Sequence, residues 1–492
     1  MDIVFIDTPD TSDITGLESV VRHREQLLST LLQASHKASS LHQNVLASLT
    51  LPIAAEDPLL IFKTFKQGSA DEIFFWAHPE EQSAFVGVGA AITIEATGLT
   101  RCASAAAQWH AIQEHAVITA SSIHLGGPML FGGFSFDPLL PSQQLWQDFP
   151  DALLILPLLH YHYSGTRAAL TINQPVNEGD DIARLADEIS ARIRSLHEAI
   201  EAENGAGTVQ DKASLQLSIQ NLLPESAWKS KVADAVKMIQ SGAFEKVVLA
   251  RGVRVVNTAE EAFDIGAVLP QLYKTYPSAH IFAFQRGQRT FVGATPEPLI
   301  EAHNKQLRTM PLAGSAPRGE TEAEDRRLGT ELLHSAKNKV EHEIVVVTIQ
   351  KVLASLCSTV RVEDTPHLLR LKNIQHLATT IVGDLLPGHS LLEALQDLAP
   401  TPAVGGFPRK PALEFIRKQE GLERGWYSGS IGWLDMQGNG EFALALRSAL
   451  IEGNQAILFA GGGIVADSHP ESEYSETCWK LQVMLRGLRG KD

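Results

Sequence analysis

Residues 456–480 constrain the fold of this chain more than any other stretch of the sequence. An apolar, strand-like segment at 456–460 runs into three glycines at 461–463, where the absence of side chains lets a backbone approach a bound group closely. A helix is expected from about Pro470 onward, and its charged residues at positions i, i+3 and i+7 share one face: Glu473, Glu476 and Lys480. A solvated charged face is the ordinary interpretation of such a pattern. A helix that follows a core strand through a glycine turn favours a ligand site instead, because its side chains and N–H groups converge on one place.

Composition excludes several classes of function. The 492 residues include 41 Lys+Arg and 57 Asp+Glu, and the resulting net charge of −16 argues against nucleic acid as a partner. No apolar run approaches the roughly 20 residues of a membrane span, so we expect no membrane partner. The first ten residues, MDIVFIDTPD, resemble no secretory signal, and three scattered cysteines fit neither a disulfide framework nor a zinc site. We therefore expect a cytoplasmic protein.

The order of short apolar runs predicts large sheets built mainly from hairpins. Strands are expected where apolar residues alternate or cluster between glycines and prolines: 71–96, 129–137, 153–165, 246–256, 280–285, 290–295 and 298–302. Helices are expected where apolar residues recur at helical spacing: 16–41, 180–203, 228–241, 322–356 with a break near Lys337, and 391–398. The Gly-Asn-Gly at 438–440 predicts a hairpin that joins 426–434 to 441–451. This order favours an α/β fold of the α+β kind, with large antiparallel sheets flanked by helices.

Charged side chains recur at positions where the local structure does not require them. Glu297 follows a strand, and Glu341 shares a helix face with Val345, so both are candidates for an interior site. Facing carboxylates repel unless a cation lies between them, and oxygen ligands suit Mg²⁺; exposed helical glutamates are an equal alternative. Lys246 opens an apolar strand and is a candidate base if buried, although an edge lysine that reaches water fits the spacing better. Arg447 lies within the apolar stretch LALRSAL, where a buried guanidinium needs an anionic partner.

Nine motifs that follow one another between about 230 and 488 resemble those of the chorismate-utilising enzymes: the isochorismate, salicylate, anthranilate and aminodeoxychorismate synthases. They are EKVVLARG (245–252), FVGATPE (291–297), PLAGSAPRG (311–319), SAKNKVEHEIVV (335–346), IQHLATTIVG (374–383), PTPAVGGFPR (400–409), YSGSIGW (427–433), ALRSA (445–449) and the glycine-to-lysine stretch at 460–480. The resemblance implies a single large domain in which residues 226–492 form the chorismate-binding catalytic region. Residues 1–225 then form the N-terminal half of the fold, with a family-variable extension at 1–60. The small, polar segment 204–215 is expected to be a loop within that domain.

The same resemblance implies roles for individual side chains around one site. Glu341 and Glu476 are expected to hold Mg²⁺, with Glu473 acting nearby through water, and the metal is expected to orient the ring carboxylate of chorismate. Further residues are expected to bind the substrate: Gly314, Ser315, His376, Ala378, Tyr427, Arg447, Gly461, Gly463 and Lys480. Among them, Arg447 and the backbone around Gly461 are expected to clamp the enolpyruvyl carboxylate.

Lys246 and Glu297 resemble the acid–base pair of this family. Lys246 is expected to take a proton from water as the water attacks C2 of the ring, and Glu297 to protonate the departing C4 hydroxyl, which yields isochorismate. This chemistry needs an uncharged lysine beside a protonated carboxyl group, a combination that burial favours. The aminating relatives usually carry glutamine at the position of Lys246, which favours water as the nucleophile here.

Two alternatives to an isochorismate synthase stay open. A salicylate synthase also eliminates pyruvate, but such relatives tend to carry a bulkier hydroxyl residue at the position of Ala378. A catalytically silent chorismate-binding protein is disfavoured because the expected acid, base and metal ligands are all present. We expect a monomer whose small-molecule substrate is chorismate.

Overall fold

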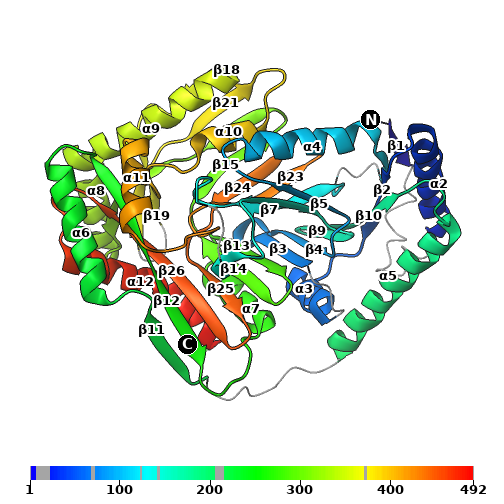
Figure 1. Cartoon of the computed structure of the whole chain (residues 1–492), viewed down its shortest axis with the longest axis horizontal. Helices are drawn as coiled ribbons and strands as arrows, with labels where there is room; N and C mark the ends of the chain where they lie inside the picture. The colour runs from blue at the N-terminus through cyan, green and yellow to red at the C-terminus, as the bar shows by residue number, and fades with distance from the viewer. Residues whose placement is uncertain are drawn as a thin grey trace.

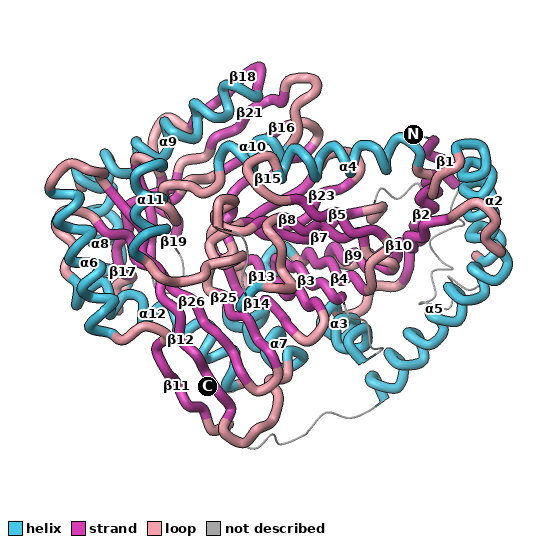
Figure 2. Tube along the Cα trace, in the orientation of Figure 1, coloured by secondary structure: helices cyan, strands magenta, loops and turns pink. Residues whose placement is uncertain are grey.

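The computed structural model describes residues 2–6, 23–67, 72–121, 125–140, 144–205, 215–370 and 374–490. Two large sheets pack face to face, helices cover their outer sides, and a small third sheet has helices of its own (Figure 1). Figure 2 shows the long strands running through the interior, with most helices at the periphery. No helix in the described ranges combines the length and the apolar character that a bilayer crossing requires.

The large sheet joins strands from both halves of the chain. In spatial order its strands are β1 (Asp2–Ile6), β6 (Val117–Ser121), β2 (Val45–Ile53), β10 (Arg167–Val176), β9 (Leu159–Ser164), β4 (Ser83–Val88), β3 (Glu72–His78), β13 (His280–Arg286), β14 (Arg289–Thr295), β25 (Ser448–Glu452), β26 (Gln455–Ile464), β12 (Lys246–Asn257) and β11 (Leu217–Asn221), while the short β22 (Gly406–Phe407) also pairs with β12. Neighbouring strands run antiparallel except where β6 pairs with β1 and β2. Because β13 pairs with β3, the N-terminal and C-terminal strands share one ladder.

The second sheet faces the first, and the small sheet lies next to the C-terminal strands. In spatial order the second sheet contains β18 (Cys357–Val362), β21 (Ile381–Leu385), β16 (Gln306–Thr309), β15 (Pro298–His303), β24 (Gly440–Leu444), β23 (Ser430–Asp435), β7 (Met129–Phe134), β8 (Ala152–Leu156) and β5 (Ile92–Ala96). The small sheet contains β17 (Leu312–Pro317), β20 (Ile374–Ala378) and β19 (His367–Arg370). The hairpin expected at 438–440 is present as the turn between β23 and β24.

The helices cover the outer surfaces of the sheets. They are α2 (Arg24–Leu41), α3 (Pro58–Gln67), α4 (Arg101–His115), α5 (Ile182–Gly205), α6 (Glu225–Gln240), α7 (Ile265–Thr275), α8 (Glu322–His334), α9 (Ala336–Leu356), α10 (Leu391–Leu398), α11 (Arg409–Gln419) and α12 (Pro470–Arg489). On the large sheet, α2, α3, α7 and α12 pack against its strands, whereas α4 and α10 pack against the second sheet. The small sheet contacts α8 and α9.

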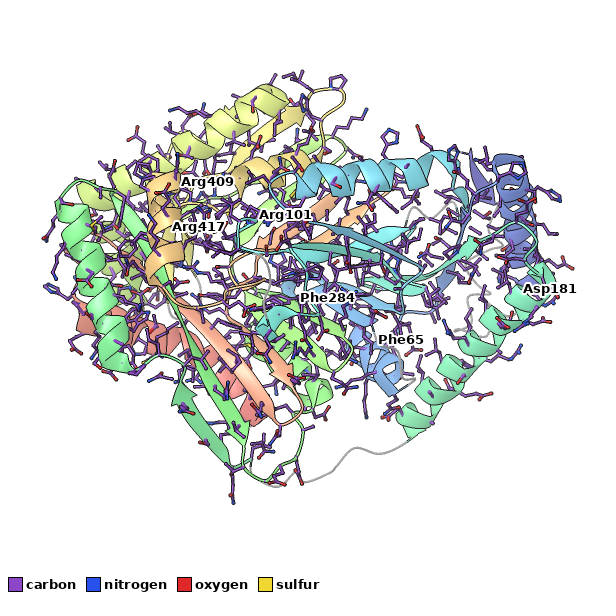
Figure 3. All side chains as sticks on the ribbon, viewed as in Figure 1. Phe65, Arg101, Asp181, Phe284, Arg409 and Arg417 are labelled. Atoms are coloured by element: carbon purple, nitrogen blue, oxygen red, sulfur yellow. The ribbon has the colours of Figure 1, made fainter. Side chains whose placement is uncertain are left out.

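Aromatic side chains fill the space between the two large sheets. Phe284 of β13 lies near the centre of the molecule (Figure 3), and its ring centroid is 5.1 Å from that of Trp426 and 6.0 Å from that of Phe149. A second core lies on the other side of the large sheet, where Phe65 of α3 and Phe75 of β3 are buried. Two apolar layers of this size hold both faces of the large sheet in fixed positions.

Most of the expected elements are present, with shifted ends. The expected helix at 322–356 breaks at Ser335, between α8 and α9, two residues before the expected position. The helix expected at 16–41 is described only from Arg24, since residues 7–22 lie outside the described ranges. Most of the segment 204–215 also lies outside them. Residues 298–302 form a strand as expected, but β15 belongs to the second sheet and does not continue the first.

Two expectations are wrong. The stretch 441–451 is not one strand, because β24 ends at Leu444 in the second sheet and β25 begins at Ser448 in the large sheet. Arg447 lies in the link between them with a φ of 47°, since the chain must bend sharply to cross from one sheet to the other. The glycines at 461–463 also form no turn: they continue β26 and pair with β12, and the turn follows them.

Candidate active site

Lys246 and Glu341 form an ion pair at one end of β12. Lys246 is the first residue of that strand, and its Nζ lies 2.8 Å from Oε1 of Glu341 on α9. The start of α9 is fixed by Ser335, whose hydroxyl accepts a hydrogen bond from the backbone N–H of Asn338. This cap sets where the helix begins and therefore which of its residues faces β12.

The three glycines of β26 leave room for side chains of the site. A Cβ atom at Gly463 would lie 3.2 Å from Cε of Lys246, and one at Gly461 would lie 3.2 Å from the hydroxyl of Tyr427. At the middle glycine it would lie 3.2 Å from Oε2 of Glu473. The glycines are therefore needed for close approach within an extended strand and not for a left-handed backbone.

The charged face of α12 packs against the same strand, β26. Glu473 accepts a hydrogen bond from the hydroxyl of Ser468 at 2.7 Å. Lys480 forms an ion pair of 2.6 Å with Glu476 and donates to the backbone oxygen of Gly461 at 2.8 Å. Burial lowers the pKa of Lys480, although the Glu476 carboxylate acts in the opposite sense. The i, i+3, i+7 face expected from the sequence is thus turned toward the glycine strand.

Glu297 occupies the link in which the chain passes from β14 of the large sheet to β15 of the second sheet. Its N–H donates to Oγ1 of Thr295 at 3.3 Å, and its carbonyl accepts from the N–H of Leu444 at 3.0 Å. Burial raises the pKa of its carboxyl group, while the positive charges of Arg447 and Lys246 act in the opposite sense. Burial that raises the pKa of a carboxyl group favours its protonated form, which can donate a proton.

Arg447 and Tyr427 present polar atoms that no neighbouring side chain uses. Across the described ranges, no hydrogen bond or ion pair engages the guanidinium of Arg447 or the hydroxyl of Tyr427. Tyr427 stacks on Phe459 with ring centroids 5.0 Å apart, and burial raises its pKa to about 12. Burial lowers the pKa of Arg447, against the opposing charges of Glu297 and Glu476. A desolvated guanidinium beside a neutral hydroxyl is well suited to bind a carboxylate.

The small sheet supplies another wall of uncharged groups. The hydroxyl of Ser315 and Nδ1 of His376 lie 2.8 Å apart on the paired strands β17 and β20. Burial lowers the pKa of His376 to about 4, so its ring is neutral near pH 7. Gly314 has a φ of +74° and approaches Asn338 so closely that an added Cβ would lie 3.0 Å from it. Ala378 is fully buried on β20.

One pair of residues was not anticipated from the sequence. Nε2 of His342 and Oγ1 of Thr379 lie 2.7 Å apart, and both side chains are buried between α9 and β20. Burial lowers the pKa of His342, so the contact is between neutral groups. The pair ties the helix that carries Glu341 to the strand that carries Ala378. The only signal in the sequence was the position of each residue next to an expected site residue.

The expected magnesium ligands do not form a closed metal site as they stand. In the part of the chain that the structure describes, no three acidic, histidine or cysteine side chains converge closely enough to hold a metal ion. Their chemistry nevertheless fits a cation. Glu341 and Glu476 each already bind a lysine ammonium. Burial raises the pKa of Glu473, and the charge of Glu476 acts in the same direction, so a divalent cation at this place would offset a real repulsion.

The fold brings the expected residues together from distant parts of the sequence. Electrostatic contacts join Arg447 to Glu297 and Glu476, and join Glu297 to Lys246 and Lys480. His376 is coupled to the same positive charges from the small sheet. The site therefore has a buried carboxyl group with a raised pKa, a lysine and an open guanidinium at the junction of the large sheet, the small sheet, α9 and α12.

The profile of the chorismate binding enzymes matches residues 31–489. The chain belongs to this family. It is 36% identical over 470 residues to isochorismate synthase MenF of Bacillus subtilis, which covers 94% of this chain and 97% of that protein. It is 38% identical over 466 residues to the salicylate biosynthesis isochorismate synthase of Pseudomonas aeruginosa, with 94% of each chain covered.

Solved structures agree with the sequence relatives of this chorismate-binding enzyme. The menaquinone-specific isochorismate synthase MenF of Escherichia coli superposes with a TM-score of 0.71 at 27% identity, covering 94% of this chain and all of that one. Anthranilate synthase component I of Streptococcus pneumoniae superposes with a TM-score of 0.66 at 22% identity, which shows the shared fold. The expected fold of large antiparallel sheets flanked by helices is confirmed.

Proposed function

We propose that this chorismate-binding enzyme is an isochorismate synthase, an isomerase that moves a hydroxyl group from C4 to C2 of chorismate. The observation that carries the proposal is the placement of Lys246 and the buried carboxyl group of Glu297 around an unpaired Arg447. Two relatives that cover 94% of the chain are named isochorismate synthases, which supports the same activity.

In the proposed reaction, Lys246 acts as the general base and Glu297 as the general acid. Lys246 takes a proton from a water molecule whose oxygen forms a bond to C2 of the ring. The ring double bonds shift, the C4–O bond breaks, and the carboxyl proton of Glu297 passes to the departing hydroxyl, which leaves as water. Each such group typically contributes about 10²–10⁴-fold to the rate. In the structure Nζ of Lys246 donates to Oε1 of Glu341, so this contact must open before Lys246 can accept a proton from water.

The remaining side chains hold the anionic substrate. Arg447 and Tyr427 bind one carboxylate, because their donors are free and the site around them excludes water. Glu341 and Glu476, with Glu473 nearby, are proposed to hold Mg²⁺, which when bound supplies positive charge to orient the other carboxylate. His376 and Ser315 contribute neutral polar atoms beside the ring.

Product analysis tests the proposal and separates it from its alternatives. The purified protein is incubated with chorismate and Mg²⁺, and the products are resolved by chromatography. Isochorismate without pyruvate is the expected result. Pyruvate released in step with turnover would identify a salicylate synthase instead. Chorismate binding without turnover at any pH would identify a silent binding protein.

We further propose a monomer that acts in the cytoplasm. The names of two relatives cite menaquinone and salicylate biosynthesis, which supports the proposal that the isochorismate made by this chain feeds one of these two kinds of pathway. Size-exclusion chromatography with light scattering tests the oligomeric state: a mass near 53.5 kDa is expected.

A further inference from the structure

A buried ion pair lies behind the candidate active site, on the edge of β12 that faces away from β26. It consists of Glu420, at the end of α11, and Arg424, one turn further along the chain. Nε of Arg424 donates to Oε1 of Glu420 and Nη2 donates to Oε2, both at 2.6 Å. The two side chains are 2% and 3% exposed, so the pair is shielded from water. Such a pair is costly to bury and is weak evidence for stability by itself.

The pair binds the backbone of β12 where no strand does. On this edge, β22 pairs with β12 only at Lys246 and Val247, and β11 pairs only at 253–257. Between these two ladders, Nη2 of Arg424 donates to the carbonyl of Val248 at 2.8 Å, and Oε2 of Glu420 accepts from the N–H of Ala250 at 2.7 Å. The ion pair therefore provides the donor and acceptor that a neighbouring strand would otherwise supply.

The remaining donors of Arg424 reach two more segments. Its Nη1 donates to the carbonyl of Val404 at 3.0 Å and to the hydroxyl of Ser428 at 3.1 Å. With the bonds to Glu420 and Val248, every N–H group of the guanidinium has an acceptor. Ser428 has a φ of 57° and follows the substrate-facing Tyr427. One side chain thus joins the base-carrying strand, the 400–405 loop and the turn that carries Tyr427.

We infer that Glu420 and Arg424 are positioning residues that hold β12, and with it Lys246, in register against the glycine strand. Val248 is two residues from Lys246 and pairs directly with Gly463, the glycine that faces the lysine side chain. Without the pair, the edge at 248–250 keeps only the bond from the N–H of Val248 to the carbonyl of Gly405 and the bond from Nε1 of Trp228 to the carbonyl of Ala250. The start of the strand can then shift by a fraction of an ångström. A misplacement of about 1 Å can cost about 10²-fold in rate. The inference rests on the proposed function, because it assigns the pair to the reaction for which Lys246 is the base.

The decisive variant removes both charges together. In Glu420→Met/Arg424→Met, the buried pair is replaced by apolar side chains of similar size, so that neither charge is left unpaired in the interior. We expect kcat with chorismate to fall about 10²-fold while KM changes less than about threefold, since Arg447 and Lys480 are untouched. We also expect faster amide hydrogen exchange in peptides that span 246–252. The melting temperature is expected to fall, because the N–H of Ala250 and the carbonyl of Val248 lose their partners, so kcat is measured well below it.

A matched control uses a neighbouring ion pair, which joins a residue of α11 to a loop residue. Arg417 of α11 (Figure 3) binds Asp137 through two hydrogen bonds, at 2.5 and 2.9 Å, and neither residue bonds to β12. Asp137→Leu/Arg417→Met is expected to keep kcat within about threefold of the wild type. A wild-type kcat in the Glu420→Met/Arg424→Met variant would overturn the inference, because the pair would then serve packing alone.

A second variant covers the case in which the double variant does not fold. Arg424→Lys keeps the charge opposite Glu420 but lacks the planar fork that reaches Val248, Val404 and Ser428 at once. We expect kcat to fall about tenfold with a folded protein, and an unchanged kcat would contradict the inference. Failure of the proposed function is distinguishable, because the wild type itself would then not convert chorismate. Amide exchange at 246–252 in the variants would still decide whether the pair holds β12, and unchanged exchange would overturn that claim.

Discussion

At the scale of single residues, the candidate site combines charges that are paired with charges that are open. Lys246 and Lys480 each bind a glutamate, whereas the guanidinium of Arg447 binds no side chain of the described chain. Arg447 is also held in the left-handed region of backbone space, which costs a non-glycine residue of order 1 kcal/mol. An open, strained arginine is understandable if its partner is the substrate.

Replacing the base tests its role directly. We expect Lys246→Ala to bind chorismate with an affinity near that of the wild type and to lose about 10²–10⁴-fold in kcat, because the proton acceptor is removed and the anion-binding groups remain. Calorimetry and steady-state assays measure the two quantities. Lys237→Ala, an exposed lysine on α6, is the control and keeps full activity. Full activity of Lys246→Ala would contradict the assignment of the base.

The proposed metal ligand on α12 is tested by a change of charge alone. Glu476→Gln keeps the size of the side chain but removes one of the charges that hold a cation, so we expect the Mg²⁺ concentration for half-maximal activity to rise at least about tenfold. Glu471→Gln lies on the same helix, is 80% exposed and binds Lys229, so it should leave the titration unchanged. Identical Mg²⁺ titrations for the wild type and Glu476→Gln would count against the metal assignment.

At the scale of elements, β26 and α12 act as one unit. β26 pairs antiparallel with β12 and carries no side chains at three successive positions. The charged face of α12, the helix that follows, packs against these glycines. Proline at the first turn and acidic residues near the N-terminus favour the start of α12, and Gly490 in a left-handed conformation ends it. The helix is thereby long enough for Glu473, Glu476 and Lys480 to face the strand on successive turns.

The space above the glycines can be tested by adding one methyl group. In Gly463→Ala the new Cβ would lie 3.2 Å from Cε of Lys246, so the lysine must move by a few tenths of an ångström. The strand itself tolerates alanine, because the backbone there is extended. We expect kcat to fall about tenfold with little loss of stability, whereas Gln455→Ala at the exposed start of the strand leaves kcat unchanged. An unchanged kcat in Gly463→Ala would show that Lys246 does not act from this position.

At the scale of the whole molecule, a polar cluster joins the two large sheets. His280 of β13 is hydrogen-bonded through Nε2 to Oε1 of Glu441 on β24, and Nε1 of Trp76 donates to the other carboxylate oxygen at 3.3 Å. His78 lies 4.9 Å from His280, ring centroid to ring centroid. Because its partners belong to different sheets, this cluster reports whether the sheets remain packed together.

The cluster gives the stability a predictable dependence on pH. Burial alone would lower the pKa of His280, but the nearby carboxylates, Glu441 foremost with Glu81 and Glu301, together raise the net pKa. Burial alone would raise the pKa of Glu441, but His280, with Trp76 and His78, lowers the net pKa. His280 therefore makes its full contribution to the free energy of unfolding below its ordinary pKa of 6.5. This contribution is lost as the pH rises through its raised pKa. Glu441 makes its full contribution to the free energy of unfolding above its ordinary pKa of 4.5. This contribution is lost as the pH falls through its lowered pKa.

Removing the histidine should therefore matter most in mildly acidic solution. We expect His280→Asn to lower the free energy of unfolding by about 2 kcal/mol between these two limits, and by less at about pH 9, because the contribution of wild-type His280 decreases as the pH rises through its raised pKa. Urea unfolding followed by circular dichroism at both pH values measures the difference. His110→Asn, whose ring is 71% exposed, is the control and changes stability at neither pH. An equal loss at both pH values would show that the pair contributes no charge-dependent stability.

Several parts of the site could be read from the sequence. Lys246 opens a strand, Glu297 lies in a link after one, and Glu473 shares a helix face with Lys480, as local patterns predicted. The motifs between 245 and 480 indicated the family, which the comparisons confirm. These features were predictable because strand alternation, helix periodicity and short motifs depend on residues that are near neighbours in the chain.

Other parts were decided only by the tertiary structure. The sequence did not show that the chain changes sheets at Arg447, that the glycines continue a strand, or that Glu420 and Arg424 complete the edge of β12. Each of these depends on which distant segments pack together, since an isolated stretch has no information about the sheet that it will join. Local propensities therefore determined the elements and the chemical groups that they carry. The packing of the two large sheets and the small sheet determined which of those groups meet, because only burial of their apolar faces fixes the elements relative to one another.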